Sequence, residues 1–132
     1  MLPTDSLVRF IVCETARQDK DNKVTLLGVF PDDKVLLPVN AQLPAAFSLA
    51  LVYFFLDGVG PFNGSFEIKS PVANWPPYQA QMPTVVKVAD KPGTVMLSFM
   101  PFVAPAFGRY EVKLILNGQD YLRGFEVAPA AD

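Results

Sequence analysis

The sequence predicts an all-β fold: an immunoglobulin-like Greek-key β-sandwich of seven or eight strands, formed by residues 1–132 as a single domain. Three observations predict it. The 132 residues suit one compact domain. The 13 prolines recur at short intervals through most of the chain and leave little room for a long helix. Short apolar segments with a period of two alternate with turn-forming residues, which is typical of sandwiches and barrels.

The N-terminal half contains four predicted strands and a loop with one short edge segment. Residues 9–14 alternate between two faces and form the first strand. Residues 24–30, VTLLGVF, form the second, and Asp21–Asn22 lies at the turn between them because Asn tolerates a left-handed backbone. The short edge segment, a long apolar strand and a half-exposed strand follow, at residues 35–37, 47–56 and 66–69.

The C-terminal half begins with an irregular, proline-rich segment and then predicts strands at residues 84–88 and 94–102. Residues 108–127 form a closing hairpin, because Asn117–Gly118 is a strong signal for a two-residue turn. Gly108-Arg109-Tyr110 precedes the penultimate strand and resembles a tyrosine corner, in which a Tyr hydroxyl binds nearby backbone in Greek-key sandwiches.

The opening hairpin, VCETARQDKDNKVTLLGVF, resembles that of a family of small, uncharacterised bacterial β-sandwich proteins. The matching positions are Cys13, Glu14, Arg17, Lys23, Leu26, Gly28, Val29 and Phe30. Asn22 stands where a glycine is expected before the lysine, which is a departure from the pattern. The resemblance implies a fold and no activity.

Residues 50–64, ALVYFFLDGVGPFNG, join an apolar run to a glycine-rich turn, as a nucleotide-binding loop does. A dinucleotide turn needs Gly-x-Gly-x-x-Gly leading into a helix. Here the third glycine, Gly64, comes one position late, Pro61 interrupts the loop, and residues 65–69 alternate with period two. We therefore interpret this segment as a hairpin between two strands.

The chain has no histidine, which removes the usual general base and the commonest transition-metal ligand. The one cysteine, Cys13, cannot form an intrachain disulfide, and its strand position beside Glu14 favours a packing role over a nucleophilic one. The acidic turn residues are mixed with lysines and do not have EF-hand spacing. We expect no enzyme activity, no cofactor and no metal.

The net charge is −2, and charges of both signs are scattered along the chain. This pattern predicts no nucleic-acid partner, because binding to phosphates requires a basic face. The apolar stretches are too short to cross a bilayer as a helix, and no basic residue precedes the first of them. These features predict a soluble, cytoplasmic protein without a membrane partner.

Period two places Val52, Phe54 and Leu56 on the outer face of the long strand if their alternate neighbours face the core. Several exposed apolar side chains are costly, so this face needs a cover. We expect a homo-oligomer contact there, and a cover of the protein's own loops is the alternative.

Trp75 and Tyr78 lie in an aromatic, proline-rich loop, and Tyr53 is another candidate to stack on a sugar ring. Trp75 could equally cap the end of the sandwich. The leading functional prediction is a non-enzymatic, self-associating interaction or scaffold module. The alternative is a small-ligand or carbohydrate-binding domain that uses Trp75, Tyr78 and Tyr53.

Overall fold

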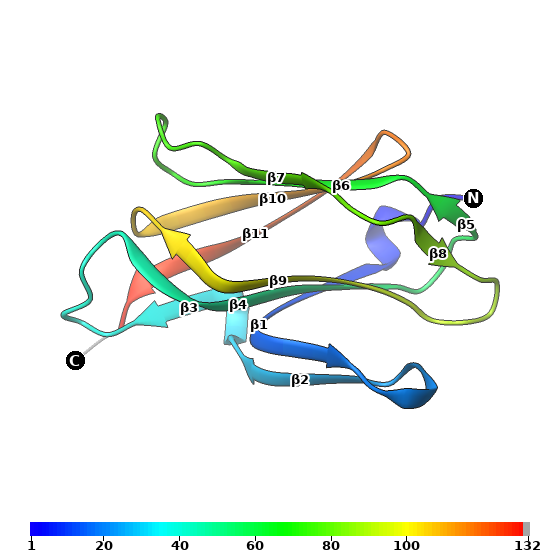
Figure 1. Cartoon of the computed structure of the whole chain (residues 1–132), viewed down its shortest axis with the longest axis horizontal. Helices are drawn as coiled ribbons and strands as arrows, with labels where there is room; N and C mark the ends of the chain where they lie inside the picture. The colour runs from blue at the N-terminus through cyan, green and yellow to red at the C-terminus, as the bar shows by residue number, and fades with distance from the viewer. Residues whose placement is uncertain (131–132) are drawn as a thin grey trace.

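The computed structural model describes residues 1–130 and is all-β, as the sequence predicts (Figure 1). Three 3-10 turns, η1 (Asp5–Leu7), η2 (Lys20–Asn22) and η3 (Pro31–Asp33), accompany eleven strands in this part of the chain. The strands are β1 (Val8–Gln18), β2 (Val24–Val29), β3 (Lys34–Leu37), β4 (Ala45–Phe55), β5 (Gly60–Phe62), β6 (Gly64–Lys69), β7 (Tyr78–Gln81), β8 (Val85–Lys87), β9 (Gly93–Ala104), β10 (Gly108–Leu116) and β11 (Gln119–Pro129).

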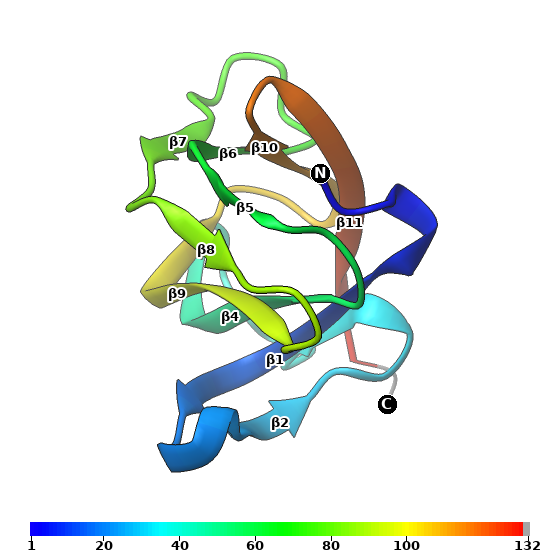
Figure 2. The ribbon, with the colours of Figure 1, turned by 90° about the vertical axis from the view of Figure 1, so that its right-hand side faces the viewer.

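The strands form two layers and a small ribbon. One sheet has the order β2-β1-β4-β9, and the other has the order β3-β11-β10-β6-β7. All pairs are antiparallel except β3 and β11, which run parallel. The ribbon of β5 and β8 spans the end of the sandwich at which the N-terminus lies (Figure 2).

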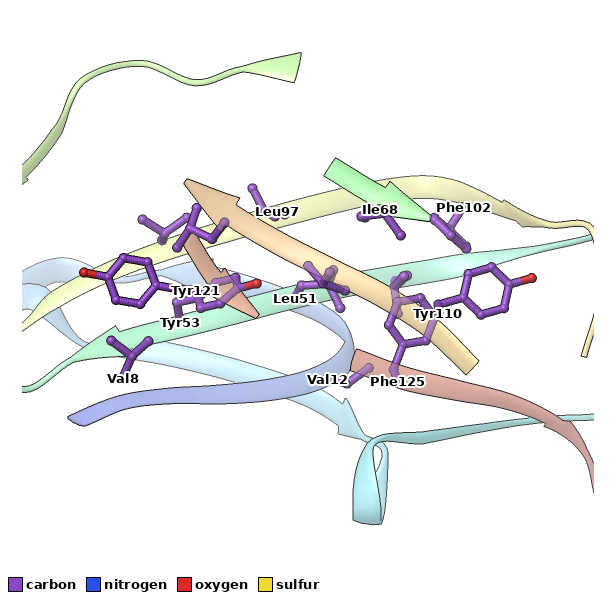
Figure 3. Close-up of a cluster of buried hydrophobic side chains, with 14 of the residues drawn as sticks. Val8, Val12, Leu51, Tyr53, Ile68, Leu97, Phe102, Tyr110, Tyr121 and Phe125 are labelled. Atoms are coloured by element: carbon purple, nitrogen blue, oxygen red, sulfur yellow. The ribbon is translucent and has the colours of Figure 1, made fainter. Parts of the chain in front are cut away.

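The core lies between the two sheets, where alternate residues of the long strands meet (Figure 3). Its centre is aromatic. Tyr110 of β10 stacks on Phe125 of β11 with ring centroids 5.1 Å apart, and Phe102 of β9 makes a T-shaped contact with each of these rings. Burying these large rings supplies much of the apolar area that stabilises the fold.

The predicted tyrosine hydrogen bond is present. The Tyr110 hydroxyl donates to the Ala106 carbonyl oxygen at 2.7 Å and accepts from the Ala106 N–H at 3.3 Å. Gly108 just before it has φ of 131°, a backbone conformation that favours glycine. The loop between β9 and β10 is therefore held by Tyr110, a residue near the start of β10.

The predicted turn at Asn117–Gly118 is also present, with φ of 48° and 82° at the two positions, as a type I′ hairpin requires. The turn contacts a second one. The Asn117 side-chain oxygen accepts from the Asn63 N–H at 2.8 Å, and the Asn117 N–H donates to the Asn63 carbonyl at 2.9 Å. The β10–β11 turn is thereby tied to the β5–β6 turn.

The hairpin predicted for residues 50–64 is wrong. The long strand β4 pairs with β1 and β9, whereas β5 pairs with β8 and β6 pairs with β10. The segment therefore crosses from one sheet to the other. Local alternation predicts a strand on each side of the turn, but it carries no information about which strands pair. Strands also follow the glycines, as predicted, and no helix begins there.

Val52, Phe54 and Leu56, which the sequence places on an outer face that needs a cover, differ in their exposure. Val52 is fully buried in a cluster with Cys13 and Ala50. Four partly buried residues pack against this cluster, and three of them, Leu26, Phe54 and Met96, have longer side chains than the fourth, Ala16. The larger neighbours thus shield Cys13, Ala50 and Val52 from solvent on the same face of the sheet. Leu56, beyond the strand end, is 53% exposed.

In the described part of the chain, no helix has the length and apolar character needed to cross a bilayer.

Candidate functional site

A cavity of about 490 Å³ lies at the end of the sandwich that carries the β5–β8 ribbon. Phe55 at the end of β4 and residues 56–59 after it form one wall, and Lys87 at the end of β8 and residues 89–92 after it form the other. We call this cavity the Lys87 pocket. Both walls are turns, and turns at the rim of a rigid sandwich commonly hold binding residues.

Lys87 occupies an inward-facing position. Along β8, Val85 and Lys87 are buried, whereas Val86 and Val88 are 65% and 51% exposed. Lys87 itself is only 3% exposed. Lysine is rarely buried to this extent, and inward positions of a strand normally hold apolar residues. The chain therefore places a positive charge where packing alone would favour a residue such as valine.

The aliphatic stem of Lys87 runs over the backbone of Gly93 at the start of β9. A Cβ atom on Gly93 would lie 2.6 Å from Cδ of Lys87 and 3.3 Å from Cδ2 of Phe55. No side chain fits in this space. The glycine thus provides the groove in which the lysine stem lies, while the ammonium group reaches the pocket.

The ammonium of Lys87 has few partners. Nζ donates to the carbonyl oxygen of Val88 at 3.0 Å. Within residues 1–130, no carboxylate lies within ion-pair distance of this nitrogen. An ammonium has three N–H donors, and a charge taken out of water needs compensating partners. The remaining donors of Lys87 are available to an anion in the pocket.

Asp57 lies in the opposite wall and is already engaged. Its Oδ1 accepts from the Thr4 N–H at 2.8 Å, and its Oδ2 accepts from the Thr4 hydroxyl at 2.6 Å. These hydrogen bonds, with a smaller contribution from the charge of Lys87, hold the pKa of Asp57 below its ordinary value. Asp57 is therefore ionised at neutral pH.

The rim of the pocket is a tight turn. The Lys91 N–H donates to the carbonyl oxygen of Val88 at 3.2 Å, and Asp90 within the turn has φ of 62°. Both Asp90 and Lys91 line the pocket and are exposed. The turn brings the Lys91 charge to the same cavity as Lys87.

The three aromatic residues predicted to bind a ligand do not form a surface together. Tyr53 is fully buried, with its ring 5.0 Å from that of Phe10, and its hydroxyl has no hydrogen-bond partner within the described residues. Tyr78 stacks on Phe102, and its hydroxyl both accepts from and donates to the backbone of Val103. Trp75, in the loop between β6 and β7, is 36% exposed, and Tyr78 is half-buried.

Tyr78 instead has a structural part in the fold. Its hydroxyl accepts from the Val103 N–H at 3.0 Å and donates to the Val103 carbonyl at 3.2 Å. Tyr78 belongs to β7, at one edge of its sheet, and Val103 belongs to β9, at the edge of the other sheet. The pair closes the sandwich along this side.

Cys13 is fully buried in the small outer-face cluster, and its thiol contacts the Thr15 carbonyl oxygen at 3.4 Å. Burial raises the pKa of the thiol, and the negative charge of Glu14 raises it further. Both effects disfavour the reactive thiolate. Within the described residues, no group of three acidic, histidine or cysteine side chains is arranged to hold a metal ion.

Sequence reasoning missed the residues of this pocket. The signal for Lys87 was present, because period two in residues 84–88 places it on the same face as Val85. No comparable signal marks Asp57 or Thr4, which lie 53 residues apart in the chain.

No protein-family model and no curated protein matches this chain. Among solved structures, the chain is similar to "Pseudomonas fluorescens alkylpurine DNA glycosylase AlkC bound to DNA containing an abasic site analog", with 10% sequence identity and a TM-score of 0.49. The match covers 92% of this chain and 30% of the glycosylase chain. This chain therefore spans less than a third of that protein.

That structure contains bound DNA, which conflicts with two predictions made from the sequence. We correct the prediction of a self-associating scaffold, together with its carbohydrate-binding alternative. We also correct the predicted partners, a homo-oligomer without nucleic acid. A similarity of this extent assigns no function to this chain by itself, so the proposal below depends on the residues of the Lys87 pocket.

Proposed function

We propose that this β-sandwich binds a phosphate group in the Lys87 pocket, either as a free anion or as part of a nucleic-acid strand. The observation that carries this proposal is the inward-facing, buried Lys87, whose ammonium has one carbonyl partner and no carboxylate within ion-pair distance in residues 1–130. A buried charge without an ion pair is costly to the fold. Such departures from local rules are expected at functional sites.

Phosphate suits the donors of the pocket. The ammonium of Lys87 retains two N–H donors after its bond to Val88, and Lys91 brings a second ammonium to the same cavity. A phosphate group offers several charged acceptor oxygens, so one group can accept from both lysines, and lysine is a frequent phosphate ligand. The carboxylate of Asp57 is occupied by Thr4 and does not neutralise Lys87.

The pocket is proposed to bind without catalysis. Histidine is absent from the whole chain. Cys13 is buried in the outer-face cluster of the β2-β1-β4-β9 sheet, whereas Lys87 belongs to the β5–β8 ribbon. Asp57 has a lowered pKa and so carries no proton to donate at neutral pH. These features support binding of a phosphate group. They do not provide a general acid and a general base that could act together in catalysis.

The test compares two substitutions of the same kind. Lys87→Met keeps the unbranched stem and removes the charge, and Lys34→Met does the same at an exposed position in β3. We would titrate each protein, at low salt, with inorganic phosphate and separately with a short single-stranded oligonucleotide. The oligonucleotide result distinguishes a strand phosphate from a free one.

We expect Lys87→Met to weaken binding roughly tenfold or more, because a hydrogen bond to a charged group contributes about 1.5–3 kcal/mol. Lys34→Met should bind as the unmodified protein does. Equal affinities in the unmodified protein and Lys87→Met, or no binding of either ligand to the unmodified protein, would refute the proposed function.

Three finer statements about the molecule are also proposals. We propose an immunoglobulin-like Greek-key topology, supported by the hydrogen bonds between Tyr110 and Ala106 and by the crossing of the chain between sheets after β4. We further propose that the chain is one domain, supported by the large buried cluster that both sheets share. A cytoplasmic location is supported by the single, unpaired cysteine.

A further inference from the structure

We propose that Thr4 is a positioning residue for the Lys87 pocket: it holds the Asp57 carboxylate in its own hydrogen bonds and so leaves the Lys87 ammonium free for phosphate. This inference rests on the proposed function and names a residue that controls the same site.

The hydrogen bonds of Thr4 use both oxygens of the carboxylate. The backbone N–H binds Oδ1 at 2.8 Å, and the hydroxyl binds Oδ2 at 2.6 Å. Hydrogen bonds to a charged acceptor are stronger than neutral ones. Both donors come from one residue at the N-terminal end of the chain, and the side chain of that residue supplies the bond to Oδ2.

An unengaged Asp57 has a nearby alternative partner. Asp57 and Lys87 line the same cavity from opposite walls, and Lys87 forms no ion pair within the described residues. The positive charge of Lys87 already contributes to the lowered pKa of Asp57. A carboxylate released from Thr4 would turn toward this ammonium and compete with an incoming anion.

The N-terminal segment has other anchors, so a change at the Thr4 hydroxyl leaves it in place. Met1 and Val59 exchange two backbone hydrogen bonds of 2.8 Å. The buried hydroxyl of Tyr121 donates to the Pro3 carbonyl oxygen at 2.6 Å. The guanidinium of Arg123 binds the backbone and side chain of Asp5. These contacts hold the residues on both sides of Thr4.

The first test measures inorganic phosphate affinity in matched variants. Thr4→Val removes the hydroxyl with little change of shape, Thr4→Ser keeps a hydroxyl, and Thr84→Val is the same change at an exposed threonine outside the pocket. We expect Thr4→Val to weaken phosphate binding about fivefold, as formation of a partly exposed ion pair implies. Thr4→Ser and Thr84→Val should bind as the unmodified protein does.

The decisive variant combines Thr4→Val with Asp57→Asn. If the released carboxylate competes with phosphate, this combination restores the affinity lost in Thr4→Val. Unchanged affinity in Thr4→Val, or a combined variant that binds as weakly as Thr4→Val, would overturn the inference while leaving the proposed function intact.

A second readout needs no ligand and separates failure of the inference from failure of the proposed function. Carbon-detected NMR follows the titration of the Asp57 carboxyl with and without Lys87→Met. The inference expects Lys87→Met to raise the Asp57 pKa more in the Thr4→Val background than in the unmodified one, because only the released carboxylate pairs with Lys87. Equal shifts in the two backgrounds would overturn the inference, even if no phosphate bound to the unmodified protein.

Discussion

Replacing Tyr53 with phenylalanine should stabilise this protein. Tyr53 is fully buried on β4, and its hydroxyl has no hydrogen-bond partner in the described part of the structure. Burial accordingly raises the pKa of Tyr53 far above its ordinary value, although the charge of Arg123 partly opposes this. The ring contact with Phe10 does not depend on the hydroxyl.

The magnitude follows from the cost of an unsatisfied polar group. Burying a hydroxyl without a partner costs about 1–3 kcal/mol, which Tyr53→Phe recovers. The void left by one oxygen, roughly 10 Å³, costs only about 0.2 kcal/mol at about 24 cal/mol per Å³. For a chain of this length, 1 kcal/mol corresponds to roughly 3–4 °C in Tm, so we expect a rise of about 3–10 °C.

Thermal and urea unfolding, followed by circular dichroism, measure this change. Tyr121→Phe is the matched control, because the equally buried Tyr121 hydroxyl donates to the Pro3 carbonyl oxygen at 2.6 Å. That variant should lose about 1–2 kcal/mol of unfolding free energy. The reasoning is refuted if Tyr53→Phe lowers Tm as Tyr121→Phe does, since the Tyr53 hydroxyl would then have a stabilising partner.

Three further predictions concern the hydrogen bonds of Tyr110, the thiol of Cys13 and the hydrogen bonds of Asp57. Tyr110→Phe should lower the unfolding free energy by about 1–3 kcal/mol, because it removes both bonds to Ala106; urea midpoints check this. Cys13 should react with a thiol reagent far more slowly in the folded protein than after unfolding, because burial raises its pKa; fast labelling of the folded state would contradict this. The lowered pKa of Asp57 means that its bonds to Thr4 add stability above the ordinary Asp pKa of about 3.9 and lose it as pH falls through the folded-state pKa. Asp57→Asn should therefore be less stable than the unmodified protein at pH about 7 and no less stable in acid, as urea unfolding at both pH values would show.

The parts of the fold that the sequence predicted depend on residues close together in the chain. Period two and frequent prolines indicated strands without long helices, and the structure is all-β. The hairpin at Asn117–Gly118 and the hydrogen bond of Tyr110 four residues back to Ala106 were predictable for the same reason. Backbone preferences and turn geometry act over a few residues, so the local sequence carries them.

Other features required the tertiary structure. The alternation along β4 correctly predicted that Val52 lies on the outer face of the sheet. Its burial there depends on the size of neighbouring residues from β1, β2 and β9. The pairing of β4 could not be read from its own residues, because every apolar strand offers the same backbone donors and acceptors. The short strand β7, within a segment expected to be irregular, forms because β6 pairs with it.

The sequence by itself thus determined the all-β class of the structure. It also excluded any site that depends on a histidine of this chain. The candidate site was decided only by the tertiary structure. Thr4 and Asp57 meet across 53 residues, and Lys87 reaches their cavity because the β5–β8 ribbon closes the end of the sandwich over Gly93. Such contacts depend on how the sheets pack and how the chain crosses between them, and alternation along a strand specifies neither.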